Sequence, residues 1–247
     1  MTSKRIAVVT GGSRGIGAAI AKKLAAQGTT VAIVYRGNRA QAQSVVDAIT
    51  AAGGTAAAFA ADVADLAAAQ SAIDAIVAQF GHIDILVNNA GTFEARTFGA
   101  IDAEHVSRVF SVNIGGVLNM TQMAVPHFSA AGGRIVNVSS NLIYTPRPGT
   151  AIYAASKAAV SVLTNAFAKE LGARGITVNA VAPSMTSTDM TAATPEARRQ
   201  AVLAATPAGR IGEPADIADV VAFLTSEDSR WITGRTILTD GGLTDAL

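Results

Sequence analysis

Short runs of apolar, mostly β-branched residues alternate with longer alanine-rich stretches along the chain. The short runs lie at residues 6–10, 31–35, 85–89, 134–140 and 176–181, with two further, weaker candidates at 55–60 and 235–240. Such runs are typical of strands buried on both faces of a parallel sheet. Helical spacing marks the segments 15–27, 39–52, 66–80, 103–128, 152–173 and 213–226. The alternation predicts an α/β fold, a doubly wound and mostly parallel seven-stranded sheet with helices on both faces.

One segment interrupts this alternation. Residues 184–214 contain three prolines and several Ser and Thr between a strand and a helix. A long polar insertion after the carboxyl end of a strand is where a substrate lid is expected, although it could also be a surface loop without a role. The 247 residues contain no charged or Pro/Ser-rich linker, so we expect a single domain over 1–247 with a helical lid insertion at 184–214.

Composition excludes several functions. The chain has no cysteine, and its three histidines are too scattered in sequence to suggest a metal site. A formal charge of +1 without a basic block gives no footprint for nucleic acid or an anionic membrane. We find no apolar run of about 18 residues that would span a bilayer, and no signal-peptide pattern at the start. A cytoplasmic protein with a small-molecule partner is expected.

The glycine-rich loop TGGSRGIG occupies residues 10–17, between the first strand and the first helix. Glycines allow a tight turn and a close approach of the backbone to a pyrophosphate, whose charge the helix N-terminus stabilises. This position makes the loop a strong sign of a dinucleotide-binding Rossmann fold. The expected cofactor contacts here are Gly11, Ser13, Arg14, Gly15, Ile16 and Gly17.

The end of the second strand indicates which dinucleotide binds. NAD-binding folds place a carboxylate there for the ribose 2′-hydroxyl, but residues 35–38 read Tyr-Arg-Gly-Asn. Arg36 can pair with a 2′-phosphate, and Arg14 could add a second cation. We therefore expect NADP(H), with the alternative that Arg36 is only a solvated loop residue.

Tyr153 and Lys157 stand four residues apart in a predicted helix, so their side chains share one face. A nearby ammonium favours the phenolate and would lower the pKa of the tyrosine toward neutrality. Such a group could both donate and accept a proton, as general acid–base catalysis requires. An isolated pair with this spacing could equally be a surface pair.

These features resemble the short-chain dehydrogenase/reductase family, and the similarity extends along nearly the whole chain. The glycine spacing G-x-x-x-G-x-G matches, as do Asn88-Asn89-Ala90-Gly91, residues 179–183 (NAVAP) and Asp240-Gly241-Gly242. Length and motif wording most resemble 3-oxoacyl-(acyl-carrier-protein) reductases. The further cofactor contacts that the resemblance implies are Asp62 and Val63 at the adenine, Asn89, Ala90 and Gly91, and Pro183, Thr186 and Thr188 near the nicotinamide.

The resemblance also implies a catalytic tetrad of Asn113, Ser140, Tyr153 and Lys157. Tyr153 would be the acid/base, Ser140 would hold the substrate oxygen, Lys157 would also bind the nicotinamide ribose, and Asn113 would anchor a water. Ser139 and Ser140 cannot both face one pocket if they end a strand, and family spacing selects Ser140. A homotetramer packed through the helices near 103–128 and 152–173 is implied as well.

Two departures from the family affect these expectations. Pro183-Ser184 replaces the usual Pro-Gly, so Ser184 would adopt a left-handed conformation at some cost if the glycine serves one. Apart from Arg174, the region offers little to bind an acidic carrier, and residues 128–133 contain no cation.

Several functions therefore stay open. They are an NADP(H)-dependent oxidoreductase for a small carbonyl or secondary alcohol, a 3-oxoacyl-(acyl-carrier-protein) reductase, and a non-catalytic NADP-binding sensor or scaffold. The near-neutral charge argues against a nucleic-acid-binding module. The side chains that could line a substrate pocket, or serve only in packing, are Phe93, Ile143, Tyr144, Met185 and Met190.

Overall fold

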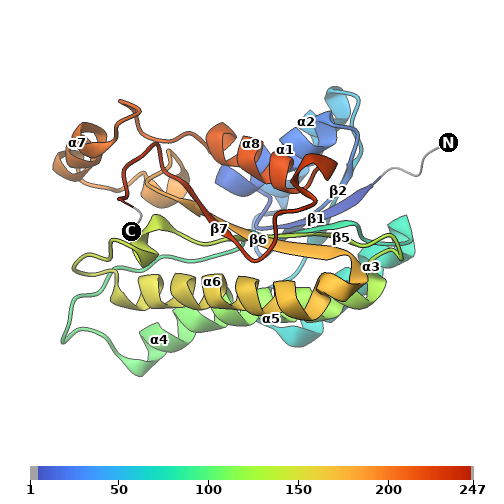
Figure 1. The fold of residues 1–247 in the computed structure, drawn as a ribbon, viewed down its shortest axis with the longest axis horizontal. Coiled ribbons are helices and arrows are strands. Elements are labelled where there is room, and N and C mark those ends of the chain that lie inside the picture. The colour runs from blue at the N-terminus through green and yellow to red at the C-terminus, as the bar shows by residue number, and fades with distance from the viewer. Residues whose placement is uncertain (1–4, 246–247) are drawn as a thin grey trace.

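The computed structural model describes residues 5–245 and contains a seven-stranded, fully parallel sheet (Figure 1). Its order, β3-β2-β1-β4-β5-β6-β7, is that of a doubly wound Rossmann fold. The strands are β1 Ile6–Thr10, β2 Thr30–Tyr35, β3 Ala56–Ala60, β4 Ile85–Asn88, β5 Gly133–Val138, β6 Ile176–Pro183 and β7 Thr236–Thr239. The predicted fold class is confirmed, and all strands rather than most are parallel.

Eight α-helices connect the strands within the described residues. They are α1 Gly15–Ala26, α2 Arg39–Ala51, α3 Leu66–Phe80, α4 Ala103–Phe110, α5 Gly116–Ala124, α6 Ala151–Leu171, α7 Glu196–Ala205 and α8 Pro214–Leu224. Helices α1, α2 and α8 cover one face of the sheet, and α3, α4, α5 and α6 lie on the other (Figure 1). No helix in residues 5–245 is long and apolar enough to cross a membrane.

Alternating strand side chains build the two cores. In β1, Ala7 and Val9 belong to the cluster shared with α1, α2 and α8, whereas Val8 belongs to the cluster shared with α3 and α5. β5 repeats the pattern, with Val136 on the first side and Ile135 on the second. Both faces of the central strands are thus apolar, which is why their sequences read as continuous hydrophobic runs.

The expected helix over 103–128 is interrupted. A π-helical turn at Ser111–Gly115 separates α4 from α5, and a 3₁₀ turn at Val125–His127 follows α5. A π-turn inserts an extra residue into a helix, and such turns are frequent at functional sites. This one contains Asn113, so the interruption sets the direction of a predicted site residue.

Candidate active site

A cavity of about 700 Å³ opens at the carboxyl ends of the central strands. It runs from the glycine loop and the end of β2, past the segment after β4, to β5, the first turns of α6 and the segment 183–205. Every residue predicted to bind cofactor lines it, and so do Ser140, Tyr153 and Lys157. Among the predicted site residues only Asn113 does not contribute to the lining.

Hydrogen bonds join the glycine loop to the segment after β4. The hydroxyl of Thr10 accepts from the backbone N–H groups of Asn89 and Ala90, at 3.0 Å each. The amide of Asn89 donates to the carbonyls of Thr10 and Gly11, at 2.8 and 3.2 Å. The motif at 88–91 therefore fixes the position of the glycine loop on the sheet.

The first turn of α1 is suited to an anion. The side chains of Asn38, Asp65 and Asp102 cap the N-termini of α2, α3 and α4, but no side chain caps α1, and its first turn has no acid. Its backbone N–H groups remain available on the cavity side, where a helix dipole favours negative charge. Gly11 and Gly15 turn the loop with φ of 64° and 53°. This donor set fits the pyrophosphate of a dinucleotide.

The two arginines expected at a 2′-phosphate both line the cavity and are largely exposed. Arg36 lies 3.8 Å from Asp62, with 72% of its side chain exposed. Arg14 pairs with Asp189 of the 184–214 segment at 3.2 Å. Exposed pairs of this kind contribute little to stability, typically about 0–1 kcal/mol, so both guanidinium groups can be redirected to a stronger anion.

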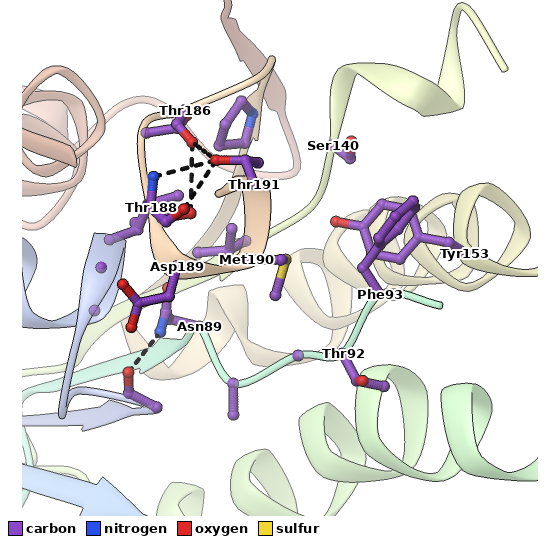
Figure 2. A pocket seen from close by; sticks show the side chains of 18 of the residues that line it. Asn89, Thr92, Phe93, Ser140, Tyr153, Thr186, Thr188, Asp189, Met190 and Thr191 are labelled. Carbon is purple, nitrogen blue, oxygen red and sulfur yellow. Dashed lines mark hydrogen bonds between the residues drawn. The ribbon is translucent and has the colours of Figure 1, made fainter. Parts of the chain in front are cut away.

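Tyr153 presents its hydroxyl to the cavity (Figure 2). Its ring packs edge-on against Phe93, with centroids 5.0 Å apart and planes at 86°. The Nζ atom of Lys157 lies 5.8 Å from the tyrosine ring centroid and donates to the carbonyl of Val138 at 2.8 Å. The residues predicted to share one helical face are thus brought together at the cavity wall.

The expected direction of the tyrosine pKa is wrong in this structure. Burial raises the pKa of Tyr153 to about 12, and the hydrogen bond with Ser140 only partly opposes it. Burial also lowers the pKa of Lys157 to about 8, because the enclosed ammonium loses solvation. Desolvation therefore favours the neutral form of both groups, and Tyr153 is a neutral phenol at pH 7.

The two adjacent serines after β5 have different partners. The hydroxyl of Ser139 bonds to the carbonyl of Lys157 at 3.0 Å and to the hydroxyl of Ser161 at 2.9 Å. Ser140 accepts from the backbone N–H of Leu142 and lies beside Tyr153 (Figure 2). Ser139 is therefore engaged by α6, while Ser140 is the serine next to the phenol.

Asn113 is fully buried and bound by protein groups. Its side-chain N–H groups donate to the carbonyl of Thr92 at 3.0 Å and the hydroxyl of Ser156 at 2.9 Å, and its oxygen accepts from the N–H of Thr92 at 2.8 Å. It thereby ties the segment after β4 to α6. The oxygen of Asn113 and the Nζ atom of Lys157 both flank Gly91, so they lie near each other behind the cavity wall. The expected water-anchoring role stays a prediction.

The substrate end of the cavity differs in part from the sequence-based expectation. Phe93, Met185 and Met190 line it, but Ile143 and Tyr144 do not. A 3₁₀ turn at Asn141–Ile143 directs Leu142 inward instead, and Tyr144 is 45% exposed. The lining residues that sequence reasoning missed include Leu142, Thr145, Arg147, Thr194, Arg198, Ala201, Val202 and Ala205. No motif marked them, because they come from a loop and from the segment around α7.

The anticipated strain at Ser184 is absent. Within residues 5–245, no residue other than glycine has a positive φ. The chain leaves β6 without a left-handed residue, and the hydroxyl of Ser184 contacts the carbonyl of Asp240 at 3.5 Å. The serine is therefore accommodated without the backbone cost that the sequence suggested.

Comparison with known proteins gives matches over nearly the full length. A family model described as enoyl-(acyl carrier protein) reductase matches residues 11–244. An uncharacterized oxidoreductase of Methylorubrum extorquens is 46% identical over 97% of both chains. A 3-oxoacyl-(acyl-carrier-protein) reductase of Staphylococcus aureus is 41% identical over 98% of this chain and 99% of its own. A short chain dehydrogenase from Burkholderia cenocepacia, solved in complex with NADP, is 42% identical with a TM-score of 0.92 over 98% of both chains.

The doubly wound sheet, with its glycine loop and the cavity at its carboxyl edge, defines a dinucleotide-binding α/β protein. The matches are more specific than the fold. The chain belongs to the short-chain dehydrogenase/reductase family of oxidoreductases.

Proposed function

We propose that the protein is an NADP(H)-dependent oxidoreductase that interconverts a carbonyl compound and a secondary alcohol. The observation that carries the proposal is the convergence of Ser140, Tyr153 and Lys157 on the cavity that the glycine loop also lines. Acid–base groups and an anion-binding helix terminus in one enclosed site are the parts that hydride transfer to a carbonyl requires.

NADPH, when bound, supplies the hydride, and the side chains control the oxygen of the substrate. Ser140 donates a hydrogen bond to the carbonyl oxygen, which stabilises the negative charge that develops there. Tyr153 then transfers its proton to that oxygen. A neutral phenol suffices for this step, because an alkoxide is a stronger base than a phenolate. Lys157 holds a positive charge beside the phenolate that is left.

The preference for NADP(H) rests on charge. Within residues 5–245, the end of β2 presents Arg36 and no acid that could bind a 2′-hydroxyl in place of a phosphate. Arg14 lies in the same part of the cavity. Similar proteins support this choice, since the Burkholderia dehydrogenase was solved with NADP and a metagenomic blue fluorescent protein, 39% identical, was solved with NADPH.

Variants that remove a single hydroxyl group test the catalytic roles assigned to Tyr153 and Ser140. We expect Tyr153→Phe to lower kcat by about 10²–10⁴ with an activated ketone, while NADPH binding measured by fluorescence changes little. Ser140→Ala should lower kcat far more than the matched Ser139→Ala. A fully active Phe variant would overturn the proposal, and a wild-type protein that binds NADPH but turns over no carbonyl would favour the sensor or scaffold.

A 3-oxoacyl-(acyl-carrier-protein) reductase is a second candidate, favoured by the 41% identity to the Staphylococcus enzyme. A carrier would need basic residues on the surface that it contacts. Arg174 is exposed beyond the C-terminal end of α6, the end opposite Tyr153, with one bond to the carbonyl of Val125, and it does not line the cavity. Turnover of an acetoacetyl group on the carrier, compared with the same group on a small thioester, separates the two functions. A large preference for the carrier, reduced in Arg174→Gln, would support the reductase of fatty acid synthesis.

We also infer a homotetramer assembled through the helices near 103–128, which are α4 and α5, and 152–173, which is α6; all three lie on the same face of the sheet (Figure 1). Val162 on α6 supports this, because its side chain is apolar and 69% exposed. Light scattering after gel filtration measures the mass. A wild-type monomer would contradict the inference, and Val162→Glu should weaken the assembly.

A further inference from the structure

Two of the arginines that line the cavity, at its substrate end, have no carboxylate from the described part of the chain to balance their positive charge. Two acids line it: Asp62 beside Arg36, and Asp189 in an ion pair with Arg14. Two more arginines, Arg147 and Arg198, also line it. Within residues 5–245, neither has a carboxylate within 4.0 Å.

Arg147 belongs to the fixed wall of the site. It precedes α6 in a turn that Thr150 closes, with the N–H of Arg147 donating to the threonine hydroxyl at 3.0 Å and that hydroxyl donating back to the Arg147 carbonyl at 2.8 Å. α6 begins at Ala151, the residue after Thr150, and carries Tyr153 in its first turn. Arg147 is therefore held in the turn that leads directly into the helix of the proposed acid/base.

Arg198 belongs to the 184–214 segment. It lies in the first turn of α7, on the helix face that also turns Ala201, Val202 and Ala205 to the cavity. The neighbouring Arg199 lies off this face, 3.9 Å from Glu196, and does not line the cavity. Helix α7 thus carries Arg198, which lines the cavity, and Arg199, which does not and can serve as a matched control.

The positive charge of Arg198 acts on Arg147. Burial lowers the pKa of Arg147, and the positive charge of Arg198 lowers it further. Arg147 nevertheless stays cationic at neutral pH, because a guanidinium titrates far above it. Two like charges, one of them half-buried, are held together at a cost that an anion between them would remove.

We propose that Arg147 and Arg198 bind an anionic group of the substrate, so that the enzyme acts on carbonyl compounds that carry a carboxylate or a phosphate. This inference rests on the oxidoreductase function proposed above. The anion would bridge the fixed wall and α7, which holds the carbonyl at Tyr153 and draws the 184–214 segment over it. Guanidinium groups bind both carboxylates and phosphates through paired, charge-assisted hydrogen bonds.

Matched pairs of substrates test the proposal with NADPH in excess. The anionic members are acetoacetate, levulinate and dihydroxyacetone phosphate, and the neutral members are methyl acetoacetate, methyl levulinate and dihydroxyacetone. We expect kcat/KM for at least one anionic member to exceed that of its neutral partner by about tenfold or more, as a charged hydrogen bond implies. The pair with the larger ratio shows whether the group is a carboxylate or a phosphate.

Variants then assign the effect to residues. Arg147→Gln and Arg198→Gln should each reduce the anionic-to-neutral ratio toward one, whereas Arg199→Gln should keep the ratio. No preference in the wild type, a preference kept in both cavity variants, or an equal loss in Arg199→Gln would overturn the proposal. Turnover of the neutral ketones separates this failure from failure of the oxidoreductase function, in which no carbonyl is reduced at all.

Discussion

Burial acts on Tyr153 and Lys157 in opposite directions. It raises the pKa of the phenol to about 12 and lowers the pKa of the ammonium to about 8. Both shifts favour the neutral form, because each charged form loses solvation. The tyrosine is consequently ready to donate a proton at pH 7, while the lysine keeps its charge only up to about pH 8. In the proposed function, a protonated Tyr153 beside a charged Lys157 suits proton donation to the substrate oxygen near neutral pH.

The buried lysine predicts a pH-dependent stability. Its pKa is about 8 in the folded chain against 10.5 for the free group. The unfolded chain therefore binds more protons between these values, so this group makes the free energy of unfolding rise with pH across that window. Lys157→Met removes the effect. The quantity to follow is the free energy of unfolding of Lys157→Met minus that of the wild type. We expect this difference to fall by up to about 3 kcal/mol between pH 8 and 10.5, because only the wild type gains stability over that range.

Urea unfolding at a series of pH values measures this difference. The titration of Tyr153 is present in both proteins and cancels. Lys169→Met is the matched control, because Lys169 lies on the same helix with its side chain in solvent, and the difference from wild type should stay flat. A flat difference for Lys157→Met as well would show that burial does not disfavour the charged lysine.

The sequence predicts which residues share a face of one helix. It does not predict which residues of different elements come together in the folded chain. That Tyr153 and Lys157 share one face follows from the four-residue repeat of a helix, whereas the choice of Ser140 came from the resemblance to the family. Arg147 and Arg198 come from a loop and a separate helix, 51 residues apart in the numbering, and neither belongs to a motif. Only the folded chain shows that both reach one cavity.

At the scale of elements, the π-turn at Ser111–Gly115 is the feature that the sequence concealed. Residues 103–128 have helical spacing throughout, and a single extra residue within a turn leaves no periodic signal. The turn is held by side-chain bonds from Asn113 to Thr92 and Ser156. These bonds depend on where β4 and α6 lie, which tertiary packing decides. The direction of Asn113 is therefore a property of the fold rather than of the local sequence.

The close contact between the glycine loop and α1 predicts what a methyl group added at Gly17 does to stability and to cofactor binding. A Cβ atom at Gly17 would lie 2.4 Å from the Gly11 carbonyl oxygen and 2.5 Å from the Asn89 amide nitrogen. We expect Gly17→Ala to lower the free energy of unfolding by about 1–3 kcal/mol, as overpacking does, and to weaken NADPH binding strongly. Denaturant unfolding and a fluorescence titration measure the two effects.

Gly172→Ala is the control for this change. Gly172 follows α6 with φ of −57°, and a Cβ atom there would meet nothing within 4 Å. The alanine should be neutral or stabilising by a few tenths to about 1 kcal/mol, since it restricts the unfolded chain. Equal losses in the two variants would contradict a specific role for the packing at Gly17.

At the scale of the whole molecule, the order of the strands determines where the site lies. β1 has β2 on one side and β4 on the other, so the chain reverses its direction across the sheet at that point. A crevice forms at such a reversal, outside the carboxyl ends of the strands. The alternation of strand and helix was enough to predict this arrangement. It could not predict the shape of 184–214, because a polar segment without a regular period carries no packing pattern.

Because the cavity joins the glycine loop, the central strands and α7, a ligand bound there stabilises the whole domain. At about 100 times its Kd, a ligand adds ~2.7 kcal/mol to the free energy of unfolding. For a chain of this size that corresponds to a rise in Tm of roughly 5–11 °C. We expect NADPH to give this rise, and NADH at the same concentration to give clearly less, because in the proposed function Arg14 and Arg36 pair with the 2′-phosphate, which NADH lacks. Differential scanning fluorimetry measures both Tm shifts, and Arg36→Leu should make the two shifts similar by reducing the one that NADPH gives.

A larger shift with NADH in the wild type would contradict the NADP(H) preference. Equal shifts that do not change in Arg36→Leu would show that Arg36 is a solvated surface residue.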